Sequence, residues 1–254
     1  MLVDTFMFYN ELDVLEIRLK TLDPYVDVFV LVEAEVNHVG GPKELYFEKN
    51  KERFKKWLPK IRHVIVTKDE SPTDTNPWSR EKYQREAILR GLGGDLIDSD
   101  IVMVSDVDEI PDMSMVKWEH LPHRAMAIHM WMYMYNFDYL FTGEPWFGTV
   151  ITQIDLFKQY GPNYFRDNRW KFPVQQYAGW HLSSFGDEKH VLNKMRTFAH
   201  ALDDNNHKHL QTEENIREWI KSGKYLDGTA NMMMERPPEA TLPPVDCSKF
   251  LRVF

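Results

Sequence analysis

The stretch IVMVSDVDEIP, residues 101–111, joins a short apolar run directly to three carboxylates. Residues 101–104 are typical of a buried strand, whereas the carboxylates of Asp106, Asp108 and Glu109 repel one another and are costly to desolvate. We call residues 106–109 the carboxylate turn. Open α/β sheets place their ligand sites at the carboxyl ends of their strands. We therefore expect a positive partner, and a binding site, where this strand ends.

The segments upstream of the carboxylate turn alternate between strands and helices. Residues 25–34 (YVDVFVLVEA) and 63–68 (HVIVTK) are near-continuous apolar and β-branched runs, which indicate strands covered on both faces. Helices are expected over 12–22, 44–57 and 79–92. This alternation predicts an α/β fold with a mainly parallel central sheet flanked by helices.

The length of the chain suits one large domain. Its 254 residues are 43% hydrophobic, which is enough for a sizeable core. We predict a single domain over residues 1–230. Residues 231–254 carry paired prolines and are expected to form an extended strap packed on that domain.

The charge of the chain limits its partners. A formal net charge of -8, without a basic block, argues against a sequence-independent nucleic-acid binder. An anionic ligand would need a metal ion or a local pocket of arginine, lysine or histidine side chains.

Cysteine content and the N-terminal segment indicate the compartment. Cys247 is the single cysteine, which excludes an intrachain disulfide and a cysteine-based zinc site and fits a reducing compartment. The first twenty residues lack a basic n-region and include Asp4, Glu11 and Asp13, so we expect neither a signal peptide nor a membrane anchor. No apolar stretch approaches the roughly 20 residues needed to span a bilayer. We expect a soluble, cytoplasmic protein.

Asp106 and Asp108 form a candidate metal site. In an extended segment, residues i and i+2 point the same way, and their hard oxygens suit Mg²⁺ or Mn²⁺. An Asp-x-Asp pair alone is a weak signal, since Asp98 and Asp100 form a second one just upstream, interpreted as a turn between a helix and a strand. The alternative is a solvated acidic turn closed by Pro111.

Five blocks of sequence, in order, resemble glycosyltransferase family 17, the family of β-1,4-mannosyl-glycoprotein 4-β-N-acetylglucosaminyltransferase. The blocks are DTFMFYNELDVLEIRLKTLDPYVDVFVLVEA (4–34), PKELYFEKN (42–50), WSREKYQREAI (78–88), VMVSDVDEIP (102–111) and AGWHLSSFG (178–186), and the resemblance extends to YLDGT (225–229). It implies a GT-A-like nucleotide-sugar-binding fold, a UDP-sugar donor (UDP-GlcNAc in the named member), a divalent cation and inversion at the anomeric carbon.

With this resemblance, the carboxylate turn becomes the expected site of Mn²⁺ or Mg²⁺. A dication between Asp106, Asp108 and a diphosphate would neutralise the carboxylates and stabilise the leaving group. Asp108 is expected to bind the metal directly, and Asp106 to reach it through water or to hold the ribose. Glu109 is expected to orient the turn or contact the sugar. His181 is the expected third protein ligand; the alternative is a buried histidine packed beside Trp180.

Further residues are expected to bind the nucleotide. Glu33 ends the first buried strand, at the edge where a base and ribose would lie. Arg80 and Arg85 fall on different faces of the helix before the metal strand, and Arg85 is expected to face the diphosphate. Lys194 and Arg196 are expected either to close over the phosphates or to be exposed on an amphipathic helix.

Inverting transfer needs a general base that takes the proton of the acceptor hydroxyl. The candidates are Asp167, Glu144 and Asp187, with Asp167 placed first. Each has a structural alternative: Asp187 can cap a helix, and Asp167 can pair with Arg166 or Arg169. Glu144 lies among aromatic residues that can stack on a sugar. The three candidates stay open.

Aromatic residues crowd the segment where an acceptor would bind. Rings can pack against the C–H faces of sugars, but most such residues belong to cores, so two or three are expected to touch a ligand. The set is Trp131, Tyr133, Tyr135, Phe137, Tyr139, Trp146 and Trp170.

These patterns and the resemblance together predict a metal-dependent inverting glycosyltransferase. It would move a hexosamine, GlcNAc by resemblance, from a UDP-sugar to a glycan hydroxyl. The alternatives are a carbohydrate-binding module or inactive transferase-like protein, and then a phosphatase of the haloacid dehalogenase type. Such phosphatases usually carry Thr or Ser two residues after the second Asp of the motif, where this chain has Ile110.

Overall fold

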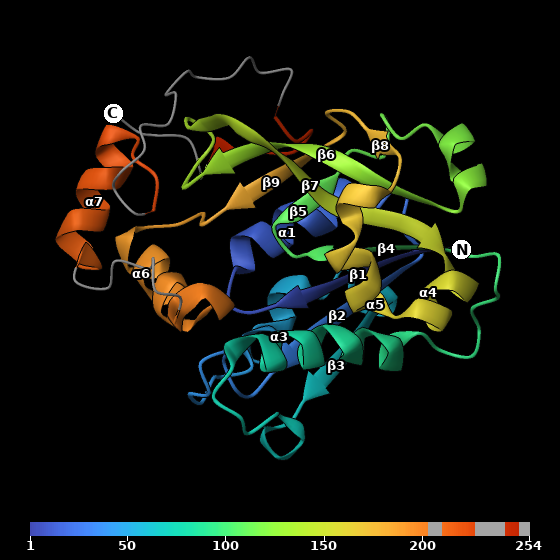
Figure 1. Ribbon diagram of the computed structural model, residues 1–254, viewed down its shortest axis with the longest axis horizontal. Helices are drawn as coiled ribbons and strands as arrows, with labels where there is room; N and C mark the ends of the chain where they lie inside the picture. Colours follow the sequence, from blue (N-terminus) through green and yellow to red (C-terminus); the bar gives the residue numbers. More distant parts are fainter. Residues whose placement is uncertain (203–209, 227–241, 249–254) are drawn as a thin grey trace.

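The computed structural model describes residues 1–202, 210–226 and 242–248. Within these residues, nine strands between Leu2 and Ser183 form one mixed sheet. The strand order across the sheet is β3-β2-β1-β4-β7-β6-β9-β5, and β8 pairs with β6 (Figure 1). The strands are β1 (Leu2–Phe8), β2 (Val28–Ala34), β3 (Ile61–Val66), β4 (Ile101–Asp106), β5 (Glu109–Pro111), β6 (Ala125–Met134), β7 (Leu140–Gln153), β8 (Val174–Gln175) and β9 (Gly179–Ser183). The α-helices are α1 (Leu12–Leu22), α2 (Tyr46–Lys49), α3 (Pro77–Glu86), α4 (Ile154–Tyr160), α5 (Pro162–Asp167), α6 (Glu188–Thr197) and α7 (Glu213–Ser222).

The first four strands form the parallel half of the sheet. β1 pairs in parallel with both β2 and β4, and β2 pairs in parallel with β3. The second half differs, because β7 runs antiparallel to both β4 and β6. A short connection, rather than a crossover helix, joins β6 to β7. The predicted α/β fold with flanking helices is confirmed. The sheet, predicted to be mainly parallel, is mixed: its first half is parallel, and antiparallel pairs enter with β7 and β5.

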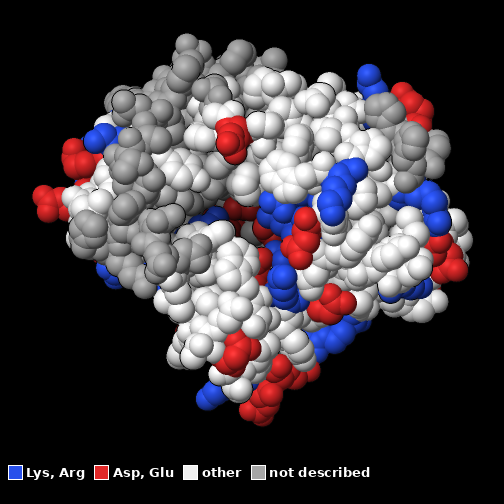
Figure 2. Space-filling model, viewed as in Figure 1, with Lys and Arg blue, Asp and Glu red and all other residues white. Residues whose placement is uncertain are grey.

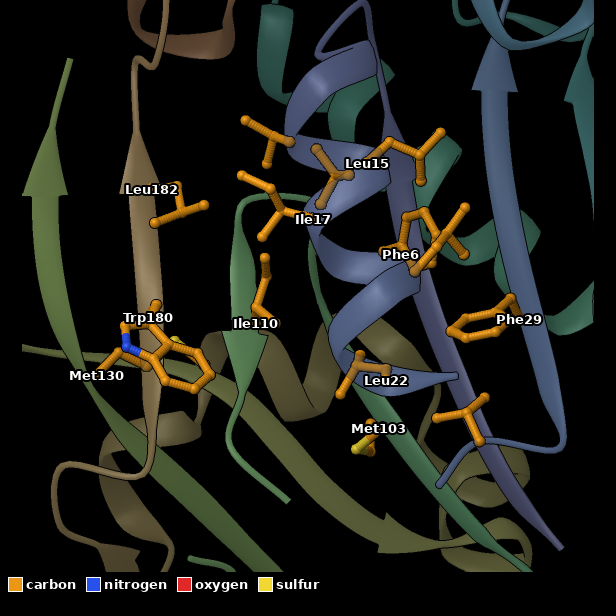
Figure 3. Packing of buried hydrophobic residues seen from close by; sticks show 14 of the residues in the cluster. Phe6, Leu15, Ile17, Leu22, Phe29, Met103, Ile110, Met130, Trp180 and Leu182 are labelled. Atoms are coloured by element: carbon orange, nitrogen blue, oxygen red, sulfur yellow. The ribbon is translucent and has the colours of Figure 1, made fainter. Parts of the chain in front are cut away.

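Both faces of the parallel half are buried under apolar side chains. On one face Phe6, Phe29 and Met103 pack with Leu15 and Leu22 of α1 (Figure 3). The other face packs against the 3₁₀-helix η4 (Ala87–Gly91) and helices α4 and α5. Burial on both faces explains why these strands read as continuous apolar runs. The strand residues on that second face include Val3, Val28, Val30, Val32, Val102 and Val104.

The helix predictions hold to different extents. The helix predicted over 12–22 coincides with α1. The one predicted over 44–57 is wrong as a continuous helix: it splits at Asn50, whose φ and ψ are -114° and 16°, into α2 and a 3₁₀-helix, η1 (Lys51–Phe54). The one over 79–92 begins earlier, because the Asn76 side chain caps α3 by accepting the Trp78 N–H.

Most of the predicted strap, residues 231–254, lies outside the described residues. Of its described part, Leu242 and Val245 pack against the core around α1, and Cys247 is buried. The division at residue 230 therefore stays a prediction. Among the helices of the described ranges, none combines the length and the apolar character that crossing a bilayer requires.

Candidate active site

The carboxylate turn joins β4 to β5. Asp106 is the last residue of β4, Glu109 is the first of β5, and Asp108 lies between them. β5 pairs antiparallel with β9, which places His181 opposite Glu109. Segments from both halves of the chain therefore meet at this turn. Figure 2 shows a hollow near the centre of one face of the molecule, in which acidic and basic side chains gather.

Arg18 of α1 fixes the backbone of the turn from inside the protein. Its side chain is fully buried and forms an ion pair with Asp4 of β1, at 2.6 Å. Its Nη1 donates to the carbonyl oxygens of Asp106, Val107 and Glu109, at 3.0, 3.2 and 2.9 Å. With three carbonyls held by one guanidinium, the turn has a defined conformation before any ligand binds.

Two arginines face the carboxylates of Asp106 and Glu109. Arg166 of α5 donates to Asp106 Oδ2 at 2.7 Å and to both Glu109 oxygens at 2.8 Å. Arg85 of α3 lies 3.4 Å from Asp106 Oδ1. Burial alone raises the pKa of Asp106, but Arg166 and Arg85 outweigh it and hold that pKa below its usual value. The Trp146 indole N–H donates to Glu109 Oε1 at 2.8 Å.

Asp108 is held by groups from the second half of the chain. Its Oδ2 accepts a hydrogen bond from Lys194 Nζ of α6 at 3.0 Å and lies 3.7 Å from His181 Nε2. Burial raises the pKa of Asp108, but Lys194 and His181 outweigh it, and the pKa lies well below its usual range. Burial likewise lowers the pKa of Lys194, and Asp108 outweighs it and raises that pKa. Asp108 is therefore a buried, ionised carboxylate.

His181 has one nitrogen to spare. Its ring stacks on Trp146, with the centroids 4.5 Å apart. Its Nδ1 is buried and has no hydrogen-bond partner among the described residues. Buried polar atoms are normally paired, so the orphaned Nδ1 is an exception. The nitrogen that lies 3.7 Å from Asp108 is Nε2, and it is this atom that could share a cation with the carboxylate.

These donors fit a divalent cation in part. Asp108 and His181 offer an oxygen and a nitrogen, a set that suits Mn²⁺. Asp106 is engaged with Arg85 and Arg166 instead. Over the described ranges, no three His, Cys, Asp or Glu side chains are grouped so that they could hold a metal ion. Of the predicted trio Asp106, Asp108 and His181, the structure pairs Asp108 with His181.

Glu33 occupies an internal position. Its carboxylate is fully buried and accepts the backbone N–H of Phe47 at 3.0 Å, in the first turn of α2. It also lies 3.4 Å from Lys43 Nζ and 3.2 Å from His63 Nε2. These contacts tie α2 to the end of β2. Nucleotide binding by Glu33 stays a prediction.

The three candidates for the general base have different surroundings. Asp167 is half-exposed and pairs with Lys82 at 3.5 Å, rather than with the neighbouring arginines. Asp187 caps α6 by accepting the His190 N–H at 2.9 Å, the structural alternative noted above. Glu144 is exposed in the part of β7 where its pairing with β6 is irregular. Their catalytic roles stay predictions.

Sequence reasoning missed several residues of this site. Arg166, a possible partner of Asp167 by its place in the sequence, instead binds the carboxylate turn. Arg18 and Trp146 also contact Glu109 of that turn, and no local pattern of the sequence predicts either contact. The available signal for Arg18 was a charged residue on the apolar face of a predicted helix, which requires a buried anion.

Five rings form a continuous strip, which we call the ring strip: Trp170, Phe147, His129, Tyr177 and Trp131. Successive centroids along it lie 4.8, 5.5, 4.3 and 4.4 Å apart. Trp170 and Tyr177 are 52% and 48% exposed. Of the seven aromatic residues considered around an acceptor, those at 133, 135, 137 and 139 are buried in the core, as expected for most of the set.

Comparisons with known proteins complete this description. Residues 1–236 match the model of a family described as glycosyltransferase family 17. A search of curated proteins found no significant match. Among solved structures, the chain is similar to a nucleoside-diphosphate-sugar pyrophosphorylase from Vibrio cholerae RC9, with 9% identity and a TM-score of 0.35 over 72% of this chain and 91% of that one.

Proposed function

Because this chain belongs to glycosyltransferase family 17, we propose that it transfers a hexosamine from a UDP-sugar to a glycan hydroxyl, with inversion at the anomeric carbon. The family indicates a glycosyltransferase that uses a sugar donor and an acceptor. The finer terms, namely a GT-A-type fold, GlcNAc as the sugar and a divalent cation, are part of the proposal.

The observation that supports the proposal best is the surroundings of Asp108. This carboxylate is buried where a parallel strand ends, and Lys194 and His181 hold it ionised. Strand ends of this kind are where α/β sheets bind ligands. We assign Asp108 and His181 as the protein ligands of Mn²⁺ or Mg²⁺. When bound there, the cation would stabilise the negative charge of the departing diphosphate.

The cationic side chains have complementary roles toward the diphosphate. Lys194 lies 3.0 Å from Asp108 and is 25% exposed, so it can exchange this carboxylate for a phosphate. Arg166 and Arg85 form ion pairs with Asp106. The Asp106 side chain is 30% exposed, so its carboxylate can also accept a hydrogen bond from a ribose hydroxyl. Binding of donor thus replaces internal ion pairs by contacts with the nucleotide.

The acceptor side of the reaction is assigned to the ring strip. Its exposed rings offer flat apolar surfaces to the C–H faces of a glycan. Trp170, at one end of the ring strip, stacks with Arg169. Arg169 also lies over the ring of Trp146, which donates a hydrogen bond to Glu109 of the carboxylate turn. Glu144, Asp167 and Asp187 remain the candidates that take the proton of the acceptor hydroxyl.

The test is a calorimetric titration of the protein with UDP in the presence of Mn²⁺. We expect binding that disappears when Mn²⁺ is removed, and a loss of more than about tenfold in affinity for Asp108→Asn. Asp98→Asn is the matched control, because Asp98 belongs to the other Asp-x-Asp pair and is 82% exposed. No UDP binding by the native protein, or equal affinity of Asp108→Asn, would reject the proposal. A carbohydrate-binding module would bind saccharides without UDP or metal.

A further inference from the structure

Arg169, in the 3₁₀-helix η6 (Arg169–Lys171), is a cation without an anionic partner among the described residues. Its Nη1 donates to the carbonyl oxygen of Arg166 at 2.7 Å. Its Nε is buried and has no acceptor in the described part of the chain. Other arginines near the carboxylate turn are paired: Arg18 with Asp4, and Arg85 and Arg166 with Asp106.

The position of Arg169 is unfavourable for an unpaired cation. Burial is the main cause that lowers its pKa, the neighbouring positive charge of Arg166 adds to it, and the carboxylates of Glu109 and Asp106 offset the two only in part. Removing a charge from water without a partner is costly. The protein nevertheless holds this guanidinium in a defined place, because its Cζ lies 4.8 Å from the centroid of the Trp170 ring and 5.5 Å from that of Trp146. Stacking on tryptophan faces is a favourable arrangement for arginine.

We propose that Arg169 binds an anionic group of a substrate, a phosphate or a carboxylate, between the carboxylate turn and the ring strip. This inference rests on the proposed function and deepens it. A planar guanidinium suits such a group, because it donates two parallel N–H···O bonds to one phosphate or carboxylate. The bound anion would satisfy the buried Nε and offset the repulsion from Arg166.

Two sources offer this chemistry. The anion is either the diphosphate of the donor, which the carboxylate turn would hold nearby, or an acidic group of the acceptor saccharide on the ring strip. Arg169 is within reach of both places. It stacks on Trp146, which contacts Glu109 of the carboxylate turn, and on Trp170, which ends the ring strip.

The experiment compares native protein with Arg169→Gln and Arg169→Lys by calorimetry. The probes are UDP with Mn²⁺, a disaccharide that carries a uronic acid, and its neutral counterpart. Lys171→Gln is the matched control, because it removes the same charge from η6, where Lys171 Nζ donates to the Asn168 side chain at 2.7 Å rather than stacking on the tryptophans. Circular dichroism and thermal melting verify that each variant is folded.

We expect Arg169→Gln to lose about tenfold or more in affinity for one anionic probe, Arg169→Lys to recover part of it, and Lys171→Gln to match the native protein. Loss of UDP affinity assigns the donor; loss of a preference for the acidic disaccharide assigns the acceptor. The inference is overturned if Arg169→Gln binds UDP as the native protein does and the native protein shows no Arg169-dependent preference for the acidic disaccharide. If that preference is present but UDP does not bind at all, the inference stands and the proposed function fails.

Discussion

Arg18 shows how one buried side chain shapes the candidate site. It is paired with Asp4 and donates to three carbonyl oxygens of the carboxylate turn. Arg18→Met leaves Asp4 buried and charged without a partner, and we expect it to lower the free energy of unfolding by about 3–5 kcal/mol. Urea denaturation measures this change.

Arg53→Met is the control for Arg18→Met. Arg53 also forms ion pairs, with Asp13 and Glu16, but at the protein surface, where such pairs contribute about 0–1 kcal/mol. A loss of stability for Arg18→Met no larger than that for Arg53→Met would contradict the role given to Arg18.

Asp108 makes the stability of the protein depend on pH. Its pKa is lower in the folded protein than in the unfolded chain, because Lys194 and His181 outweigh burial. Its ion pairs therefore stabilise the fold fully above the unfolded pKa of about 3.9, and this stabilisation is lost as pH falls toward the folded pKa. We expect the destabilisation by Asp108→Asn to be constant near pH 6 and to shrink below about pH 4. Urea denaturation between pH 3 and 6 measures the difference in free energy of unfolding between the native protein and Asp108→Asn. If this difference stays the same over that range, Asp108 does not form the proposed ion pairs.

At the scale of elements, helix α6 places the ammonium group of Lys194 beside the carboxylate turn, which lies between β4 and β5. Lys194 points from α6 to Asp108, whereas Lys189 of the same helix is exposed. We expect Lys194→Gln to weaken UDP binding in the presence of Mn²⁺ by about tenfold, since it removes a charge-assisted contact with the diphosphate. Lys189→Gln should bind UDP as the native protein does. Calorimetry compares the two, and equal affinities would exclude Lys194 from the nucleotide site.

The elements also show what the sequence can and cannot predict. Strand β4 and the place of Asp106 and Asp108 at its end follow from local patterns: an apolar run and the polar residues that end it. The contact between Arg166 and the turn depends on how α5 packs against β4 after the antiparallel return of β7, which no local pattern encodes. For the same reason, the sequence around Arg166 and Arg169 (FRDNRW, residues 165–170) does not predict which groups these arginines contact.

At the scale of the whole molecule, two halves of one sheet divide the tasks. The parallel half supplies the carboxylate turn, and its burial on both faces could be predicted from apolar runs. The second half brings His181 and Trp146 beside that turn through the pairing of β5 with β9 and of β6 with β7. Strands β6 and β7 also carry three rings of the ring strip. The pairing of β5 with β9 joins residues about 70 positions apart in the chain, and the register of β6 with β7 is irregular, so the mixed sheet and the ring strip could not be predicted from sequence periodicity alone.

The central claim is that Asp108 and His181 hold a divalent cation against a nucleotide diphosphate. The most direct measurement is an anomalous difference map at the manganese edge, from crystals of the protein grown with Mn²⁺ and UDP. We predict a peak within bonding distance of an Asp108 oxygen and a His181 nitrogen, with Lys194 moved from Asp108 to a phosphate. A map without such a peak, with the nucleotide bound elsewhere and Lys194 still paired to Asp108, would contradict the account.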